Sequence, residues 1–244
     1  MEIWQFAILL IGGLVAGTIN TIAGGASLLT VPLLVLAGVP GNTANGSNRL
    51  GVITSSAAAG YEFRRKGVSD KDYLWKVLPA VVLGSLGGSL IVSQLSDTTF
   101  ERVFGILMIP ILILSVRKPK VHDSGKSWPF WVTMLVFFGI GMYGGAFQAG
   151  IGLLLLVALS RAGLDLVTAN SVKVLINVAV SLVALSVFIS QGFFALLPAV
   201  TLAIGFAAGG VLGARISVRG GERVIRPVMI AAVFALSGRL IGLY

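Results

Sequence analysis

The residues of this chain best suited to chemistry are two asparagines and an arginine in otherwise apolar sequence. Asn45, Asn48 and Arg49 stand in TANGSNRL at 43–50, between SLLTVPLLVLAGVP and GVITSSAAAG. Spacings of three and four residues allow all three to share one helix face. A guanidinium with neighbouring amides offers N–H donors that suit the oxygens of a sulfonate, phosphate or carboxylate. The pattern predicts a binding site for a small anion.

A second set of polar residues lies about 125 residues further along the chain. This set consists of Gln148, Asn170, Lys173 and Asn177. Lys173 occupies the position equivalent to Asn48, so each half presents one cation at a similar place. All nine Asp and Glu residues lie at run ends or in loops, which leaves Arg49 and Lys173 without an intramembrane counter-charge. A small anionic substrate would supply one. Alternatively, the cations reach an interface or bind backbone carbonyls, and the asparagines cap helices or join them.

The composition of the chain is typical of a membrane protein. Of 244 residues, 56% are hydrophobic and 11% are charged, whereas a soluble domain has about 25% charged residues. Apolar runs fall at 5–37, 43–60, 74–96, 100–116, 129–160, 168–190, 194–216 and 224–243. Most approach the ~20 residues that span a bilayer as a helix. The sequence predicts an all-α polytopic membrane protein forming one transmembrane domain over 1–244.

Two runs, 5–37 and 129–160, are too long for one crossing, and each is interrupted by small residues. TIAGGAS at 21–27 and GGAFQAGIG at 144–152 divide them into a full helix and a short helix. The short helices, 27–37 and 151–161, are expected to be re-entrant. The first would reach roughly 16 Å, about half of the bilayer. Its N-terminus near Ser27 is expected to converge with the next helix N-terminus, at Asn42 or Thr43, and to attract anions.

Internal similarity indicates a duplication. Gly25, Gly38 and the run Thr43–Asn45 recur 125 residues later; LPAV at 78–81 returns at 197–200, and ERV at 101–103 returns at 222–224. The basic residues change sides between the halves. The loop 61–76 has five cations and its counterpart at 190–194 has none, whereas 97–102 has only Arg102 and its counterpart has Arg215, Arg219, Arg223 and Arg226. This predicts two inverted repeats of about five helical elements, at about 1–117 and 128–244. Two parallel four-helix units are the alternative.

The same charge bias predicts the orientation in the cell (inner or plasma) membrane. Both termini are expected outside, and the loops 61–73 and 117–128 are expected in the cytoplasm. The net charge of +9 is explained by these loops, so no nucleic-acid partner is expected. Glycines at 84 and 88, and at 205, 209 and 213, suit close helix packing within a protomer or in a homodimer.

Enzymatic chemistry has little support. The chain has no cysteine, and its one histidine, His122, lies in a polar loop. No carboxylate pair stands in an apolar run, so acid–base catalysis, a metal and a cofactor are not expected.

The stretch GTINTIAGGASLLTVPLLVLAGVPGNTANGSNRLGV at 17–52 resembles the TauE/SafE family of membrane permeases, known for sulfite and organosulfonate export. Members commonly read G-G-G where this chain has Gly24-Gly25-Ala26, and A-T-N-R where it has the run Gly46–Arg49. The resemblance implies a substrate such as sulfite, sulfoacetate or another short sulfonate. The expected substrate-binding residues are Asn20, Gly24, Gly25, Ser27, Asn45, Asn48, Arg49, Gln148, Gly150, Asn170, Lys173 and Asn177.

The sequence thus predicts a transporter that exports a small anion by alternating access. An inside-negative potential drives a monovalent anion outward by about 2.3 kcal/mol per 100 mV, so export requires no coupling ion. The alternatives are an anion channel, an importer of a different small anion, a scaffold that binds no anion, and a membrane enzyme.

Overall fold

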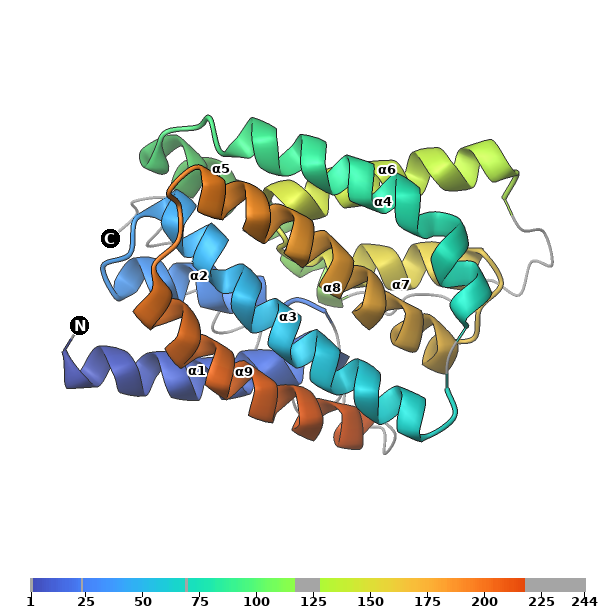
Figure 1. Ribbon diagram of the computed structural model, residues 1–244, viewed down its shortest axis with the longest axis horizontal. Helices are drawn as coiled ribbons and strands as arrows, with labels where there is room; N and C mark the ends of the chain where they lie inside the picture. The colour runs from blue at the N-terminus through green and yellow to red at the C-terminus, as the bar shows by residue number, and fades with distance from the viewer. Residues whose placement is uncertain (1, 23, 69, 117–127, 218–244) are drawn as a thin grey trace.

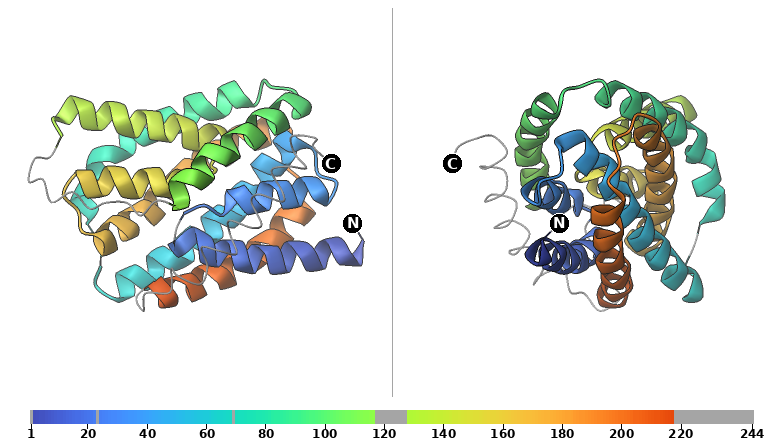
Figure 2. Two further views of the ribbon diagram at one scale, coloured as in Figure 1. Left: turned by 180° about the vertical axis from the view of Figure 1, so that it is seen from behind. Right: turned by 60° about the vertical axis from the view of Figure 1, so that its left-hand side comes forward.

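The computed structural model describes residues 2–22, 24–68, 70–116 and 128–217, and these are helical with short connections. The helices are α1 (Ile3–Ile22), α2 (Ser27–Leu36), α3 (Gly41–Arg65), α4 (Lys71–Val92), α5 (Asp97–Val116), α6 (Phe130–Ala146), α7 (Ile151–Arg161), α8 (Leu166–Ser190) and α9 (Leu196–Ser217). The long helices lie side by side along one direction, seen from the front in Figure 1 and from behind in Figure 2. The run 224–243, His122, Arg219, Arg223, Arg226 and the loop 117–127 lie outside the described residues.

Both expected breaks are present, and the all-helical class is confirmed. The run 5–37 divides into α1 and the 10-residue α2, and the run 129–160 divides into α6 and the 11-residue α7. Gly24 and Gly150 turn the chain with φ angles of +77° and +69°. A φ in this left-handed region strains residues with a Cβ, so the glycines mark where each helix must end.

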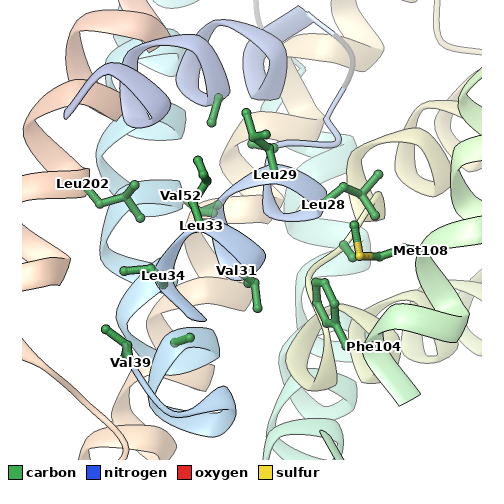
Figure 3. Close-up of a cluster of buried hydrophobic side chains, with 14 of the residues drawn as sticks. Leu28, Leu29, Val31, Leu33, Leu34, Val39, Val52, Phe104, Met108 and Leu202 are labelled. Atoms are coloured by element: carbon green, nitrogen blue, oxygen red, sulfur yellow. The ribbon is translucent and has the colours of Figure 1, made fainter. Parts of the chain in front are cut away.

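The short helix α2 is enclosed by protein on all sides. Its residues 27–34 are all buried. Figure 3 shows four of its leucines, at 28, 29, 33 and 34, and Val31 among side chains of α3, α5 and α9. A helix that is apolar around its whole circumference is stable only inside a core. This burial explains how a helix of about 15 Å can begin inside the bundle, at the break after α1.

Helix pairing follows the duplication. The first helix of each half packs against the fourth helix of the other half, α1 against α9 and α6 against α4, while α3 and α8 pack together. Glycines 205, 209 and 213 lie against the α1 backbone, and glycines 84 and 88 lie against the α6 backbone. The predicted close packing is therefore confirmed within one chain. A homodimer through small-residue helix faces stays a prediction.

The central helices α3 and α8 run in opposite directions. Gly46 lies against Phe188, and Gly60 lies against Leu175, so positions rise along one helix as they fall along the other. Because α3 and α8 occupy equivalent places in the two halves, these opposed directions support the inverted arrangement. The inversion across a bilayer stays a prediction.

The outer surface suits lipid. Among the described residues, four helices are long and apolar enough to cross a bilayer: α1, α4, α8 and most of α9. Leu83, Ile106 and Leu135 are examples of large apolar side chains exposed along the helices. Trp75 and Trp131 are exposed near the first residues of α4 and α6, and tryptophan is enriched where a membrane meets water.

Candidate functional site

The two helix breaks meet backbone to backbone. The N–H of Gly152 donates a hydrogen bond to the carbonyl oxygen of Gly24 at 3.2 Å. A Cβ on either glycine would overlap the backbone of the other. The ends of α1 and α6 and the beginnings of α2 and α7 therefore come together. Sequence reasoning chose Gly24 but missed Gly152, although both lie in the small-residue segments that end the long helices.

Arg49 of α3 is fully buried and binds the C-terminal end of α6. One terminal nitrogen donates to the carbonyl of Gly144 and to Oε1 of Gln148, both at 2.6 Å. The other donates to the carbonyls of Gly145 at 2.8 Å and Ala146 at 3.3 Å. The C-terminal end of a helix carries a partial negative charge, so these carbonyls stabilise the guanidinium.

Two further predicted residues support this contact. Asn45 accepts a hydrogen bond from Arg49 at 3.1 Å and donates one to the carbonyl of Ala146 at 2.7 Å. Gln148 has a φ of 62°, the only positive φ of a non-glycine residue among the described residues. Backbone strain of this kind persists only where the surroundings enforce it, and it is concentrated at functional sites. The structure thus brings Arg49, Asn45 and Gln148 together.

Lys173 of α8 makes the equivalent contact with the other half. Its Nζ donates to the carbonyls of Thr21 at 3.2 Å and Asn20 at 3.5 Å, at the end of α1. With the offset of 125 residues, these carbonyls correspond to those of Ala146 and Gly145. Each buried cation therefore caps the broken helix of the opposite half. These contacts match the alternative in which the cations bind backbone carbonyls, so the cations do have partial counter-charges.

Asn48 does not join Arg49. Its amide nitrogen donates to Ser27 Oγ at 2.8 Å, and its amide oxygen accepts from Thr30 at 2.6 Å, so it ties α3 to α2. The expectation that Asn48 shares a contact face with Asn45 and Arg49 is wrong. Ser27 is the first residue of α2, and its side chain does not cap the helix.

The expected convergence of two helix N-termini is also wrong. α3 runs antiparallel to α2, so its N-terminus lies at the far end of α2 from Ser27. There the N–H of Asn42 donates to a carboxylate oxygen of Asp97 at 2.8 Å, and its side chain donates to the carbonyl of Leu95 at 2.7 Å. The α3 N-terminus already holds an anionic group of the chain itself. The helix start that lies near Ser27 is that of α7.

One face of α8 carries buried polar atoms without partners. Both side-chain atoms of Asn177 and the hydroxyl of Ser181 are fully buried and make no hydrogen bond. Asn177 and Ser181 follow Lys173 at successive spacings of four, so the three share a helix face. Phe188 continues this face, and its ring centroid lies 5.5 Å from Cζ of Arg49. Sequence reasoning missed Ser181, which its spacing from Asn177 could have indicated.

The remaining predicted residues complete the picture. All twelve are buried. The Asn20 amide nitrogen donates to Ser55 at 2.9 Å and to Ser56 at 3.3 Å, and Asn170 has an unpaired amide oxygen. Gly25 belongs to the turn before α2, and Gly150 precedes α7. The described residues contain no His, Asp and Glu cluster that could hold a metal ion.

The apolar helices form the bundle of a polytopic membrane protein, and two of them break beside buried cations. Secondary transporters commonly form their substrate sites at broken helices of this kind. The sequence profile described as "Sulfite exporter TauE/SafE" matches residues 9–240, so the chain belongs to the TauE/SafE family.

Similar proteins carry transporter names. A "Probable membrane transporter protein" of Haemophilus influenzae is 27% identical over 96% of this chain and 94% of that protein. "Probable membrane transporter protein ORF9" of Sinorhizobium sp is 26% identical over 97% of this chain and 92% of its own length. "Probable membrane transporter protein YfcA" of Escherichia coli K12 is 27% identical over 93% of this chain and 86% of that protein. No solved structure is significantly similar. The chain is thus a membrane transporter of this family.

Proposed function

We propose that the chain exports a small sulfur-containing or organic anion, such as sulfite, sulfoacetate or another short sulfonate. The family description supports a sulfur oxyanion. The observation that carries the proposal is the charge of the interior. Arg49 and Lys173 are fully buried, and no Asp or Glu is among the buried residues of the described ranges. Helix ends supply only partial negative charge, so the interior has a net positive potential that attracts an anion.

Alternating access around the two helix breaks is the proposed mechanism. Gly24 and Gly152 are where the two helix breaks touch, and transporters with inverted repeats rock one repeat against the other around a site formed at broken helices. Opening on either side would require the ends of α1 and α6 to move relative to α8 and α3. The contacts of Lys173 and Arg49 are the ones that this motion would strain.

The charges at the two ends of the bundle support the proposed orientation. Ser171, near the start of α8, donates to the carbonyl of Val68 at 2.9 Å, so the α3–α4 and α7–α8 connections lie at one end. Exposed cations gather at this end, and they are Arg64, Arg65, Lys66, Lys71, Lys76 and Arg161. The α4–α5 connection at the opposite end carries Asp97 and Glu101 with Arg102. By the positive-inside rule, the basic end faces the cytoplasm of the cell membrane, and the N-terminus faces outward.

The membrane potential favours export of an anion. A bound monovalent anion leaves the cell down the electrical gradient by about 2.3 kcal/mol per 100 mV, without a coupling ion. The chain is expected to catalyse no reaction, because the buried groups of the described site contain neither a carboxylate pair nor a nucleophile with an adjacent base.

Proteoliposome flux tests the proposal. Vesicles containing the purified protein are loaded with sulfite, sulfoacetate or acetate, and an inside-negative potential is imposed with potassium and valinomycin. We expect efflux of at least one of the sulfur anions to saturate and to be inhibited by a second substrate of the same class. Efflux no faster than from protein-free vesicles would refute transport, and a conductance that does not saturate would indicate a channel instead.

A further inference from the structure

The two buried cations are held very differently. The terminal nitrogens of Arg49 make five hydrogen bonds of 2.6 to 3.3 Å, and only its Nε is unpaired. Lys173 makes two, at 3.2 and 3.5 Å, although an ammonium has three N–H donors. Arg49 therefore has little capacity left for a ligand, whereas Lys173 retains a free donor and has only long contacts to replace.

The helix faces beyond these positions differ as well. In the first half, the equivalents of Lys173, Asn177 and Ser181 are Asn48, Val52 and Ser56. Asn48 is bonded to α2 through both of its side-chain polar atoms, Val52 is apolar, and Ser56 accepts a hydrogen bond from Asn20. The polar side chains at these equivalent positions of α3, Asn48 and Ser56, thus have partners within the protein.

On the α8 face, the side chains of Asn177 and Ser181 have no hydrogen-bond partner. Asn177 and Ser181 are 0% exposed, and three side-chain atoms on them have no partner. An unpaired polar group in a buried, apolar setting destabilises the folded protein, because it has lost its hydrogen bonds to water. Fully buried groups of this kind call for a specific explanation, because most such groups in proteins are hydrogen-bonded. A ligand that accepts and donates hydrogen bonds beside Lys173 provides one.

We propose that the transported anion binds on the face of α8 formed by Lys173, Asn177 and Ser181, and that Arg49 is a positioning residue that holds α3 against the end of α6. This assignment rests on the proposed function and specifies its binding site. Neighbouring members of the α8 face are one turn apart, about 6 Å along the axis. A sulfonate or sulfite group, which presents several oxygens, can therefore contact the ammonium and the Asn177 amide together.

The proposed site predicts an unusual effect of replacing Asn177. If its amide serves only the ligand, replacing it with an apolar residue should not weaken the protein without ligand. Removing a buried polar group that has no partner is neutral or stabilising, whereas removing one that is paired leaves its partner unsatisfied. Stability and affinity should therefore change in opposite directions.

The experiment measures thermal unfolding and anion affinity of the purified full chain in detergent, with sulfite, sulfoacetate and acetate as probes. For Asn177→Leu, we expect a Tm without anion equal to or above that of the wild type, and a Kd for the bound sulfur anion raised about tenfold or more. That factor corresponds to the loss of one hydrogen bond to a charged group. Ser181→Ala should weaken binding in the same direction, with a smaller steric change.

Ser160→Ala is the matched control, because the Ser160 hydroxyl is also buried and unpaired but belongs to α7. Its Kd should equal that of the wild type. A wild-type Kd in both Asn177→Leu and Ser181→Ala would overturn the assignment, and so would a lower Tm of Asn177→Leu without anion. If wild-type protein binds none of the probes, the proposed function fails as well. If it binds and the α8 variants are unaffected, only the assignment fails.

Discussion

Replacing Arg49 with lysine is the sharpest test of how the buried guanidinium is held. The substitution keeps the charge and a similar length, but it replaces a planar fork with a single nitrogen. The terminal nitrogens of Arg49 contact five acceptor atoms, and a lysine can serve at most three. The two contacts that we expect to be lost are the longest, to Asn45 at 3.1 Å and to Ala146 at 3.3 Å.

The expected loss follows from these contacts. Hydrogen bonds to charged groups contribute about 1.5–3 kcal/mol each. Because the two lost bonds are long and Ala146 keeps its bond from Asn45, we take the lower value for each. Arg49→Lys should therefore reduce the free energy of unfolding by about 3 kcal/mol. Arg49→Leu removes every contact, and we expect that this variant does not accumulate as folded protein.

Equilibrium unfolding in mixed micelles, titrated with sodium dodecyl sulfate, measures this difference. Arg64→Lys is the matched control, because Arg64 is exposed at the end of α3. Exposed substitutions of this kind usually change stability by less than about 0.5 kcal/mol. If Arg49→Lys were as stable as the wild type, the carbonyl contacts would contribute nothing measurable, and the account of Arg49 as a tie between α3 and α6 would be refuted.

Three further predictions concern packing, capping and motion. Gly84→Ala should destabilise the protein by about 1–3 kcal/mol, because its Cβ meets the α6 backbone; Gly87→Ala, with no atom within 4 Å, should be neutral or slightly stabilising in the same unfolding assay. Hydrogen bonds from the side chain and backbone of Thr168 lower the pKa of Asp165 below its ordinary value of 3.8. The contribution of this cap is therefore present above that value and lost as the pH falls through the lowered pKa. Asp165→Ala should cost about 1 kcal/mol at neutral pH and less in strong acid, where the protonated carboxyl is a weaker acceptor, and a pH-independent difference would contradict this. Gly152→Ala should slow proteoliposome efflux, because a methyl group would separate the two helix breaks; wild-type flux in a folded variant would show that their contact does not matter.

The broken helices could be predicted because length and composition alone require them. A run of apolar sequence longer than one crossing must end somewhere, and the segments 21–27 and 144–152 contain the residues that tolerate a turn. The offset of 125 residues then identified equivalent positions in the two halves. These local signals predicted short helices at 27–37 and 151–161, and the helices in the structure span Ser27–Leu36 and Ile151–Arg161.

The partners of the polar side chains could not be predicted in the same way. Adjacent helical residues project about 100° apart, so Asn48 and Arg49 had to face different neighbours, and only the packing of α2 and α6 decides which. The contacts of Arg49 lie 95 or more residues away for every partner except Asn45. The two helix N-termini were wrongly expected to meet, because an antiparallel pair places them at opposite ends of α2.

The exchange of caps between the halves has a consequence for biosynthesis. When α3 enters the membrane, the carbonyls that accept the hydrogen bonds of Arg49 have not yet been synthesised. Gly144, for example, follows Arg49 by 95 residues. The first half must therefore be inserted with a guanidinium that has only Asn45 as its acceptor, and the remaining contacts form only after α6 is inserted. The first half by itself contains only Asn45 among the five acceptors of Arg49, and the second half contains neither acceptor of Lys173. The two fragments should therefore accumulate only when they are produced together.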